Sequence, residues 1–412
     1  MSEGAQTLAV PEKRFAIRDA SFVNCGMAGF VVAAVMCHLL VLRLGLSPWV
    51  QLACGITAII GLLGTAFAVK ILTGEDGFVF YRDAITALIL VAVVLRLLHQ
   101  PVLRYLDVTV LGAGLFQAFG RIGCLLVGCC HGRPARFGVR YSAKHSLTGF
   151  PRYLVGIRLF PVQAVESVYV FSLVALGCRL LLGAVPEGSI IATYILAYAA
   201  GRFWIEFFRG DADRPFIGGF SEAQWISLLL SAFVVSAEGF GLLPRSRWHW
   251  AVPLFLCSAT LLLYIFRHFD STDRFELAHP HHVRELGEAI ERLRHGHLSR
   301  GASENGQDAA QSVKLFSTSA GLVLSSSVLS LRDRRAVHFS ISRHPGRLEL
   351  RQVRRLAILI SRLNSLAVPF DLEPGSSGVF HILFSFPVPE NNPSPGHMPS
   401  SGASSWQSFN SS

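Results

Sequence analysis

The sequence predicts an all-α polytopic membrane protein with seven to eight transmembrane helices, followed by a small α+β C-terminal appendage and a disordered tail. Hydrophobic residues make up 51% of the 412 residues and charged residues only 16%. The mean hydropathy of +0.45 exceeds that of typical soluble domains. Apolar segments close to the roughly 20 residues that a helix needs to cross the hydrocarbon core recur up to Arg267 and then stop.

Eight apolar segments are candidate spans, and each is bounded by glycine, proline or charged residues. They cover residues 23–44, 50–72, 84–99, 106–130, 161–183, 189–208, 221–243 and 249–267. The third segment is short and the fourth is rich in glycine, so the count is seven or eight. Basic residues precede the first segment without a clear small-residue cleavage site, which predicts an uncleaved first helix.

The composition divides the chain into five parts. We expect an N-terminal tail at 1–21, a membrane domain at 22–267, a charged helix with a flexible linker at 268–314, a small α+β appendage at 315–386 and a disordered tail at 387–412. In the appendage, short apolar or alternating runs at 321–328, 336–342 and 378–386 surround a helical pattern at 349–365. The last part is rich in Pro and Ser.

The formal net charge is +10, yet the arginines are scattered through loops and the C-terminal part. This distribution lacks a nucleic-acid-binding stripe, so we expect anionic membrane lipid, and no nucleic acid, as the partner. A long basic loop covers residues 132–160, and positive charge also precedes the first span. Charge counting places both on the cytoplasmic side.

Residues 120–134 read GRIGCLLVGCCHGRP, a glycine-rich apolar run that contains Arg121. An arginine at membrane depth costs at least about 3 kcal/mol unless it pairs or reaches the headgroups, so by default it marks a functional site. The alternative is that Arg121 lies near a helix end and reaches the headgroup layer, while the glycines serve close helix packing.

A second charged pair interrupts an apolar helix. Residues 198–209 read YAAGRFWIEFFR, which places Arg202 and Glu206 on one helical face. The alternative here is a buried structural ion pair. Guanidinium groups stay charged at any working pH and present a planar fork of donors to phosphate oxygens. Arg121 and Arg202 together therefore predict a clamp for a phospholipid phosphodiester.

Several runs, in order, resemble the motifs of the prolipoprotein diacylglyceryl transferases. Residues 120–134 are similar to the signature G-R-x-G-N-F-x-N-G-E-x-x-G-R-P, and GVRY follows at 138–141. The other similar runs are GFVFY at 77–81, FPVQAVES at 160–167, the 198–209 helix and SEAQWIS at 221–227. The ordered set covers roughly residues 20–245.

This resemblance implies an enzyme, a phosphatidylglycerol–prolipoprotein diacylglyceryl transferase of the bacterial inner (cytoplasmic) membrane. Such an enzyme transfers the diacylglyceryl group of phosphatidylglycerol to the lipobox cysteine thiol in the signal peptide of a prolipoprotein. A thioether forms and glycerol phosphate is released, which is the first step of lipoprotein maturation. The resemblance implies no cofactor and no metal. It also suggests seven spans and an external N-terminus, opposite to the result of charge counting.

The resemblance also implies the site residues. Those expected to be catalytic are Arg121, Arg202, Glu206 and Tyr81. Those expected to bind phosphatidylglycerol are Arg121, Gly132, Arg133, Arg202, Gln163 and Glu166.

The sequence departs from the family pattern at three positions. Cys124 replaces an asparagine, Phe160 replaces a histidine, and Tyr81 occurs where some family members have the histidine proposed as base. Tyr81 could act as a base only if Arg82 next to it stabilised the phenolate, and a tyrosine of the interfacial belt is the alternative. The rival bases are His131 and Glu206.

Two further functions remain alternatives. The departures favour a catalytically altered family member that acts as a lipid-binding membrane protein. The grouping of Cys124, Cys129 and Cys130 instead suggests a thiol-based membrane oxidoreductase or, with His131, a soft-metal site. These cysteines lack C-x-x-C spacing, and free cysteine behaves as a small hydrophobe, so we favour simple packing in a glycine-rich helix.

Overall fold

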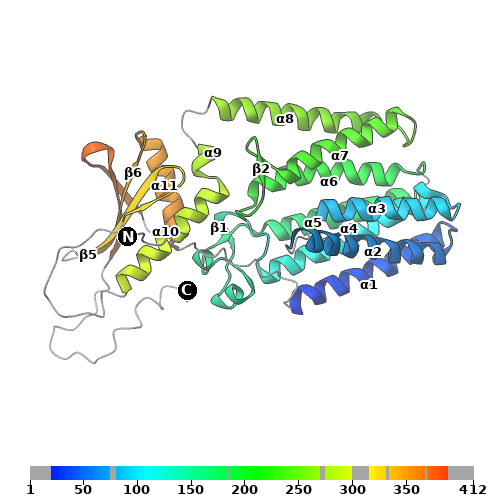
Figure 1. Cartoon of the computed structure of the whole chain (residues 1–412), viewed down its shortest axis with the longest axis horizontal. Helices are drawn as coiled ribbons and strands as arrows, with labels where there is room; N and C mark the ends of the chain where they lie inside the picture. The colour runs from blue at the N-terminus through cyan, green and yellow to red at the C-terminus, as the bar shows by residue number, and fades with distance from the viewer. Residues whose placement is uncertain are drawn as a thin grey trace. The chain divides into compact units, whose positions relative to one another are not determined.

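The structure, a computed structural model, describes residues 20–74, 80–183, 185–269, 274–298, 315–330, 334–366 and 369–387 (Figure 1). Most of the expected N-terminal tail, the linker, the C-terminal tail and the start of the 77–81 run lie outside the described residues. Two compact units are formed. Of the described residues, the first unit contains those up to Gly132 together with Lys144–Phe150 and the described part of Pro161–His268, and the second contains Arg133–Ala143, Pro151–Phe160 and those from Phe269 onward.

The described part of the first unit is a bundle of long helices (Figure 1). They are α1 (Ala20–Arg43), α2 (Pro48–Thr73), α3 (Phe80–Leu97), α4 (Val102–Val127), α5 (Val162–Leu181), α6 (Ser189–Ile205), α7 (Glu222–Gly239) and α8 (Ala251–His268). Short 3-10 turns are η2 (Ala143–Thr148), η4 (Glu206–Phe208) and η5 (Arg247–Trp250), and a small hairpin pairs β2 (Phe216–Ile217) with β3 (Phe220–Ser221). Left-handed glycines end two helices, Gly74 after α2 with φ 72° and Gly128 after α4 with φ 87°.

Six helical segments of the described residues are long and apolar enough to cross a membrane, so the chain is a multi-pass membrane protein. They are Ala20–Arg43, Pro48–Thr73, Val102–Val127, Val162–Leu181, Ser189–Phe208 and Arg247–His268. The expected count of seven to eight is therefore not confirmed. The two other predicted spans form α3 and α7, which are 18-residue helices. Charges interrupt their apolar character, Arg82, Asp83 and Arg96 in α3 and Glu222 and Glu238 in α7.

Helix α4 is the centre of the bundle and packs on α1, α2, α3, α5 and α6. Small residues on α4 allow the closest packing against its neighbours. At Gly112, for example, a Cβ would lie only 2.5 Å from Cys37 Sγ. Asp107 on α4 is buried and accepts hydrogen bonds from Gly188 N at 2.7 Å and Ile191 N at 2.8 Å. A carboxylate at the N-terminus of α6 satisfies free amides and fixes α6 against α4.

The second unit contains a five-stranded antiparallel sheet of order β4-β5-β6-β8-β7. The strands are β4 (Phe316–Ser317), β5 (Leu322–Ser330), β6 (Arg334–Arg343), β7 (Phe370–Pro374) and β8 (Phe380–Pro387), and α11 (Leu350–Leu363) lies between β6 and β7 in sequence. One sheet face is apolar, because buried Leu324 lies opposite buried Ile341, and buried Phe339 lies opposite buried Ile382. The predicted α+β appendage is confirmed as a small sheet region near the C-terminus.

The basic loop after α4 shares the second unit with the C-terminal elements. The loop forms β1 (Pro134–Val139) and the turn η3 (Arg152–Leu154), while the C-terminal chain adds α9 (Arg274–Leu277) and α10 (Pro280–Leu298). Arg362 on α11 donates a hydrogen bond to the Pro134 carbonyl at 3.3 Å. The Tyr153 ring lies over Gly287 of α10, where a Cβ would meet it at 2.3 Å. The loop is therefore held by residues far along the chain.

Candidate active site

The two arginine-bearing runs meet at the ends of three helices. Arg121 lies in the last two turns of α4, Glu166 lies near the start of α5, and Arg202 lies in the last turn of α6. The turn η4 continues α6 and carries Glu206. Because α4 packs on α5 and α6, these charged side chains reach one another.

Glu166 is the acceptor at the centre of the first group. Its Oε1 lies 3.1 Å from Arg121 Nη2 and 3.9 Å from Arg202 Nε. The same oxygen accepts hydrogen bonds from the Tyr198 hydroxyl at 3.0 Å and from Gln117 Nε2 at 3.3 Å. Glu166 thus links the arginines of α4 and α6 through one carboxylate.

Glu206 is the acceptor at the centre of the second group. Its Oε2 lies 2.5 Å from Arg202 Nη1 and 3.8 Å from Arg209 Nη1, and its Oε1 pairs with Arg214. Asp211 joins the outer side, where its Oδ2 lies 2.7 Å from Arg209 Nη2 and 3.1 Å from Arg214 Nε. Arg202 contacts both groups, so a single charged cluster results.

The composition of this charged cluster gives it an excess positive charge. Its members are the guanidinium groups of Arg121, Arg202, Arg209 and Arg214 and the carboxylates of Glu166, Glu206 and Asp211. Among these described side chains, four guanidinium groups face three carboxylates, so the named members together carry a formal charge of +1. A phosphodiester carries one negative charge and accepts hydrogen bonds from guanidinium donors.

The cluster is buried, which raises the energetic importance of its pairing. The side chains of Arg202 and Glu166 are 5% and 2% exposed, and that of Arg121 is 12% exposed. Removing one partner from such a pair typically costs about 3–5 kcal/mol, because a charge is left uncompensated. Arg202 Nη1 and Glu206 Oε2 are in contact with each other. Within the described residues, however, neither atom makes a hydrogen bond of good geometry.

The remaining predicted binding residues occupy different places. Gly132 forms an isolated β-bridge with Arg209 and therefore lies beside the cluster. Gln163, three residues before Glu166, is buried and donates from Nε2 to the Cys129 carbonyl at 2.8 Å. Arg133 belongs to the second unit, where its Nη1 donates to the Ala278 carbonyl at 3.3 Å.

The three predicted bases differ in what they contact. The buried Tyr81 hydroxyl pairs with the Ser227 hydroxyl at 3.0 Å, and its ring packs on Tyr198 with centroids 5.7 Å apart. The Glu206 carboxylate forms ion pairs with Arg202, Arg209 and Arg214. His131 follows α4 and is buried, with Nδ1 3.0 Å from the Gly132 carbonyl, and burial lowers the pKa of His131 below its ordinary value.

Sequence reasoning did not find every member of the charged cluster. Asp211 and Arg214 follow the 198–209 run in a short polar segment, and their pattern of alternating charge directly after a buried helix was the available signal. Gln117, one turn before Arg121 on α4, was also missed. A polar side chain on the same helical face as an intramembrane arginine is a signal of a shared network.

Comparison with known proteins places this site in a family. The family model described as "Prolipoprotein diacylglyceryl transferase" matches residues 25–237, which is more than half of the chain. The chain belongs to the prolipoprotein diacylglyceryl transferase family. The match contains the whole charged cluster, from Arg121 to Arg214, whereas α8 and the C-terminal sheet lie beyond it.

Several curated relatives within this transferase family are similar over the same region. The phosphatidylglycerol–prolipoprotein diacylglyceryl transferase of Clostridium tetani is 34% identical over 168 residues, which is 40% of this chain and 66% of the relative. An enzyme of the same name, numbered 2, from Clostridium perfringens is 34% identical over 160 residues, covering 38% and 59%. One from Dehalococcoides mccartyi is 34% identical over 165 residues, covering 40% and 61%. The chain thus spans less than two thirds of the length of each relative.

Proposed function

We propose that this protein is a phosphatidylglycerol–prolipoprotein diacylglyceryl transferase of the bacterial inner membrane. Its substrates are phosphatidylglycerol and the lipobox cysteine in the signal peptide of a prolipoprotein. Residues 22–267 form the transferase domain, with α3 and α7 completing seven or eight spans. The observation that carries the proposal is the buried charged cluster, whose excess positive charge suits one phosphodiester.

The reaction replaces a carbon–oxygen bond by a carbon–sulfur bond. The thiolate of the lipobox cysteine attacks the glycerol carbon that bears the phosphate ester in the diacylglyceryl moiety. That carbon's bond to the phosphate oxygen breaks, and glycerol phosphate leaves with the electron pair. The thiol proton passes to a base, so the products are the thioether and glycerol phosphate.

The charged cluster stabilises the leaving group. A phosphodiester carries one negative charge and the departing phosphomonoester dianion carries two, so negative charge grows on the phosphate as the carbon–oxygen bond breaks. Arg121 and Arg202 are the donors that meet this charge, and their fixed placement by Glu166 and Glu206 avoids reorganisation during the reaction. Gly132, Arg133 and Gln163 complete the proposed lipid-binding set.

A transfer assay tests the proposal. The purified full chain is incubated with phosphatidylglycerol and a synthetic lipobox peptide, and the peptide is weighed by mass spectrometry. We expect the mass of the peptide to increase by one diacylglyceryl group, and we expect no increase for a peptide with serine in place of the lipobox cysteine. An unmodified cysteine peptide would contradict the proposal and favour the lipid-binding alternative.

A second assay identifies the base. The Tyr81→Phe and His131→Gln variants are compared on a cysteine peptide and on the same peptide with selenocysteine, whose selenol ionises without a base. Loss of the base lowers kcat on the cysteine peptide by about 10²–10⁴-fold. If a variant has a low kcat on the cysteine peptide but a nearly normal kcat on the selenocysteine peptide, the substituted residue is the base. If kcat falls equally on both peptides, the residue has a positioning role.

A further inference from the structure

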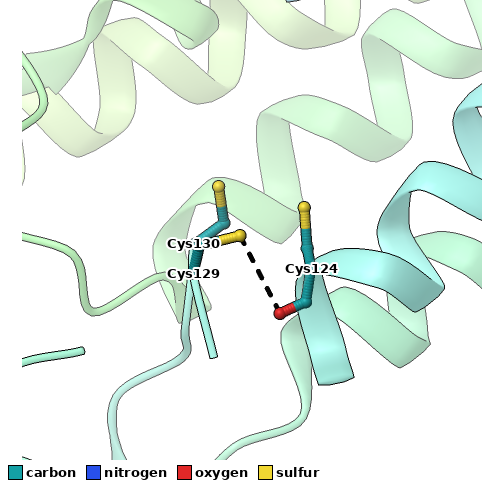
Figure 2. Close-up of side chains that lie close together, drawn as sticks. All are labelled: Cys124, Cys129 and Cys130. Carbon is teal, nitrogen blue, oxygen red and sulfur yellow. Dashed lines mark hydrogen bonds between the residues drawn. The ribbon is translucent and has the colours of Figure 1, made fainter. Parts of the chain in front are cut away.

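Three cysteine thiols gather where α4 ends. Cys124 lies in the last turn of the helix, and Cys129 and Cys130 follow the left-handed Gly128. The three Sγ atoms all lie within 4.8 Å of one another (Figure 2). In Figure 2 the dashed line marks the 3.9 Å contact from Cys129 Sγ to the Cys124 carbonyl oxygen.

The backbone conformation is what brings adjacent cysteines together. Cys130 has a φ of 52°, a left-handed conformation that non-glycine residues rarely adopt. This conformation is strained for a residue with a side chain and persists where the surrounding structure imposes it. Figure 2 shows the Cys130 and Cys124 side chains extending in the same direction, with the Cys129 sulfur between them. Packing of small apolar side chains alone does not require this convergence.

The spacing and access of the sulfur atoms suit a metal ion. Zn²⁺–sulfur bonds of about 2.3 Å imply sulfur–sulfur separations of about 3.8–4.0 Å in a site with three thiolates. The sulfur atoms are separated by up to 4.8 Å here, so each pair has to move together by less than about 1 Å to reach the separation of a metal site. Cys129 and Cys130 are partly exposed, so an ion can reach them, whereas Cys124 is buried.

Two arginines lie on the stretches of chain next to the cysteines. Arg121 lies one turn before Cys124 on α4, and the backbone of Gly132, which follows the cysteines, forms a β-bridge with that of Arg209. Guanidinium groups near a thiol stabilise the thiolate. Thiolates select soft ions such as Zn²⁺ and Cu⁺ over Mg²⁺ and Ca²⁺, which prefer oxygen ligands.

We propose that Cys124, Cys129 and Cys130 form a binding site for one thiophilic ion, Zn²⁺ or Cu⁺, with three thiolate ligands. Binding releases the thiol protons and leaves one coordination position of Zn²⁺ open. Three thiolates can instead complete a trigonal Cu⁺ site. The proposal concerns metal binding alone and does not depend on the transfer reaction.

Direct titration tests the site. The full chain, reduced and then freed of reductant under nitrogen, is titrated with Cd²⁺ as a spectroscopic probe. We expect an ultraviolet thiolate-to-metal charge-transfer band that saturates at one equivalent. Competition by Zn²⁺ and by Cu⁺ then distinguishes the two ions by which one displaces Cd²⁺ at the lower free concentration.

Matched variants locate the ligands. The triple variant Cys124→Ser, Cys129→Ser and Cys130→Ser should lose the band. The control triple variant Cys54→Ser, Cys178→Ser and Cys257→Ser, which replaces cysteines outside the cluster, should keep it.

A single substitution keeps the test decisive if the triple variant does not fold. Cys129→Ser changes one partly exposed ligand, and we expect the Kd for Cd²⁺ to rise at least about tenfold. The proposal is overturned if the wild-type chain gives no band, if the cluster triple variant keeps it, or if Cys129→Ser leaves the Kd unchanged.

Discussion

Glu206 contacts three guanidinium groups, which makes it a structural centre of the charged cluster, and in the proposed transfer it also positions Arg202. Its carboxylate holds Arg202 on the inner side and Arg209 and Arg214 on the outer side. The sequence predicted the Arg202–Glu206 pair from spacing alone, because a separation of four residues places them on one helical face. It could not predict Arg214, whose contact depends on how the chain turns back after η4.

Arg202→Ala should reduce transfer strongly. In the proposed transfer, Arg202 is a donor that meets the charge growing on the phosphate, and loss of one such donor costs about 10²–10³-fold in kcat. Peptide lipidation rates measured by mass spectrometry check this, with membrane insertion followed in parallel. Arg104→Ala is the matched control, because Arg104 pairs with Glu187 at an exposed position and its loss should leave the rate unchanged. Wild-type turnover in Arg202→Ala would contradict the clamp.

Glu206→Gln should destabilise the protein as well as slow transfer. A neutral amide leaves buried guanidinium groups without their counter-charge, a loss of about 3–5 kcal/mol for a buried pair. The thermal unfolding midpoint of the purified variant should therefore fall by several degrees. An unchanged midpoint would show that Glu206 does not stabilise the cluster.

At the scale of elements, the lengths of the apolar segments predicted where the helices lie. They were a poorer guide to which helices can span a membrane. The expected 106–130 and 189–208 segments correspond to α4 and α6, but α3 and α7 carry enough charge to fall short of an unambiguous span. In the appendage, alternating runs predicted β5, β6 and β8. The strands β4 and β7 were missed, because each is short and forms only against a long neighbour.

Close helix packing at Gly201 gives a prediction about α5 and α6. A Cβ at Gly201 would lie 2.2 Å from the Tyr169 ring, whose hydroxyl is held by the Ala197 carbonyl at 2.5 Å. Gly201→Ala should therefore lower stability by about 1–3 kcal/mol through overpacking. Differential scanning fluorimetry of the purified variant measures the shift.

Gly64→Ala is the matched control for that substitution. Gly64 is also helical, but nothing lies within 4 Å of a Cβ placed there. Alanine should be neutral or stabilising by about 0.5–1 kcal/mol, because it restricts the unfolded chain. Equal midpoint shifts in the two variants would show that the α5–α6 contact is looser than described.

At the scale of the whole molecule, the family match covers most of the bundle but not α8, and in the second unit it reaches only the loop after α4. From composition we expected the membrane domain to end at residue 267, because apolar segments stop after Arg267. Composition could not predict that the basic loop shares a unit with the C-terminal elements. Such long-range contacts, for example Arg362 with Pro134, depend on tertiary structure alone.

The second unit should lose stability in mild acid because of His282. Its imidazole is buried, Nδ1 contacts the Leu277 carbonyl at 2.8 Å, and burial lowers the pKa of His282 below its ordinary value of about 6.5. The unfolded chain therefore binds the proton more readily than the folded chain. Stability should fall as the pH drops through about 6.5, and unfolding of the second unit followed by hydrogen exchange at several pH values measures it.

Two variants separate this effect from other titrating groups. His282→Gln should flatten the pH dependence, whereas His281→Gln on the same helix should keep it. His338, whose pKa is lowered by burial and by His381, should leave a smaller residual dependence in both. A profile that is unchanged in His282→Gln would contradict the assignment.

The most direct measurement counts both products of the proposed transfer in one reaction. Wild-type protein, phosphatidylglycerol and a lipobox peptide are incubated, and the lipidated peptide and the released glycerol phosphate are quantified together. We expect equal amounts of the two products from the wild-type protein, and both should be nearly absent in Arg202→Ala. Glycerol phosphate without lipidated peptide, or neither product from correctly inserted wild-type protein, would contradict it.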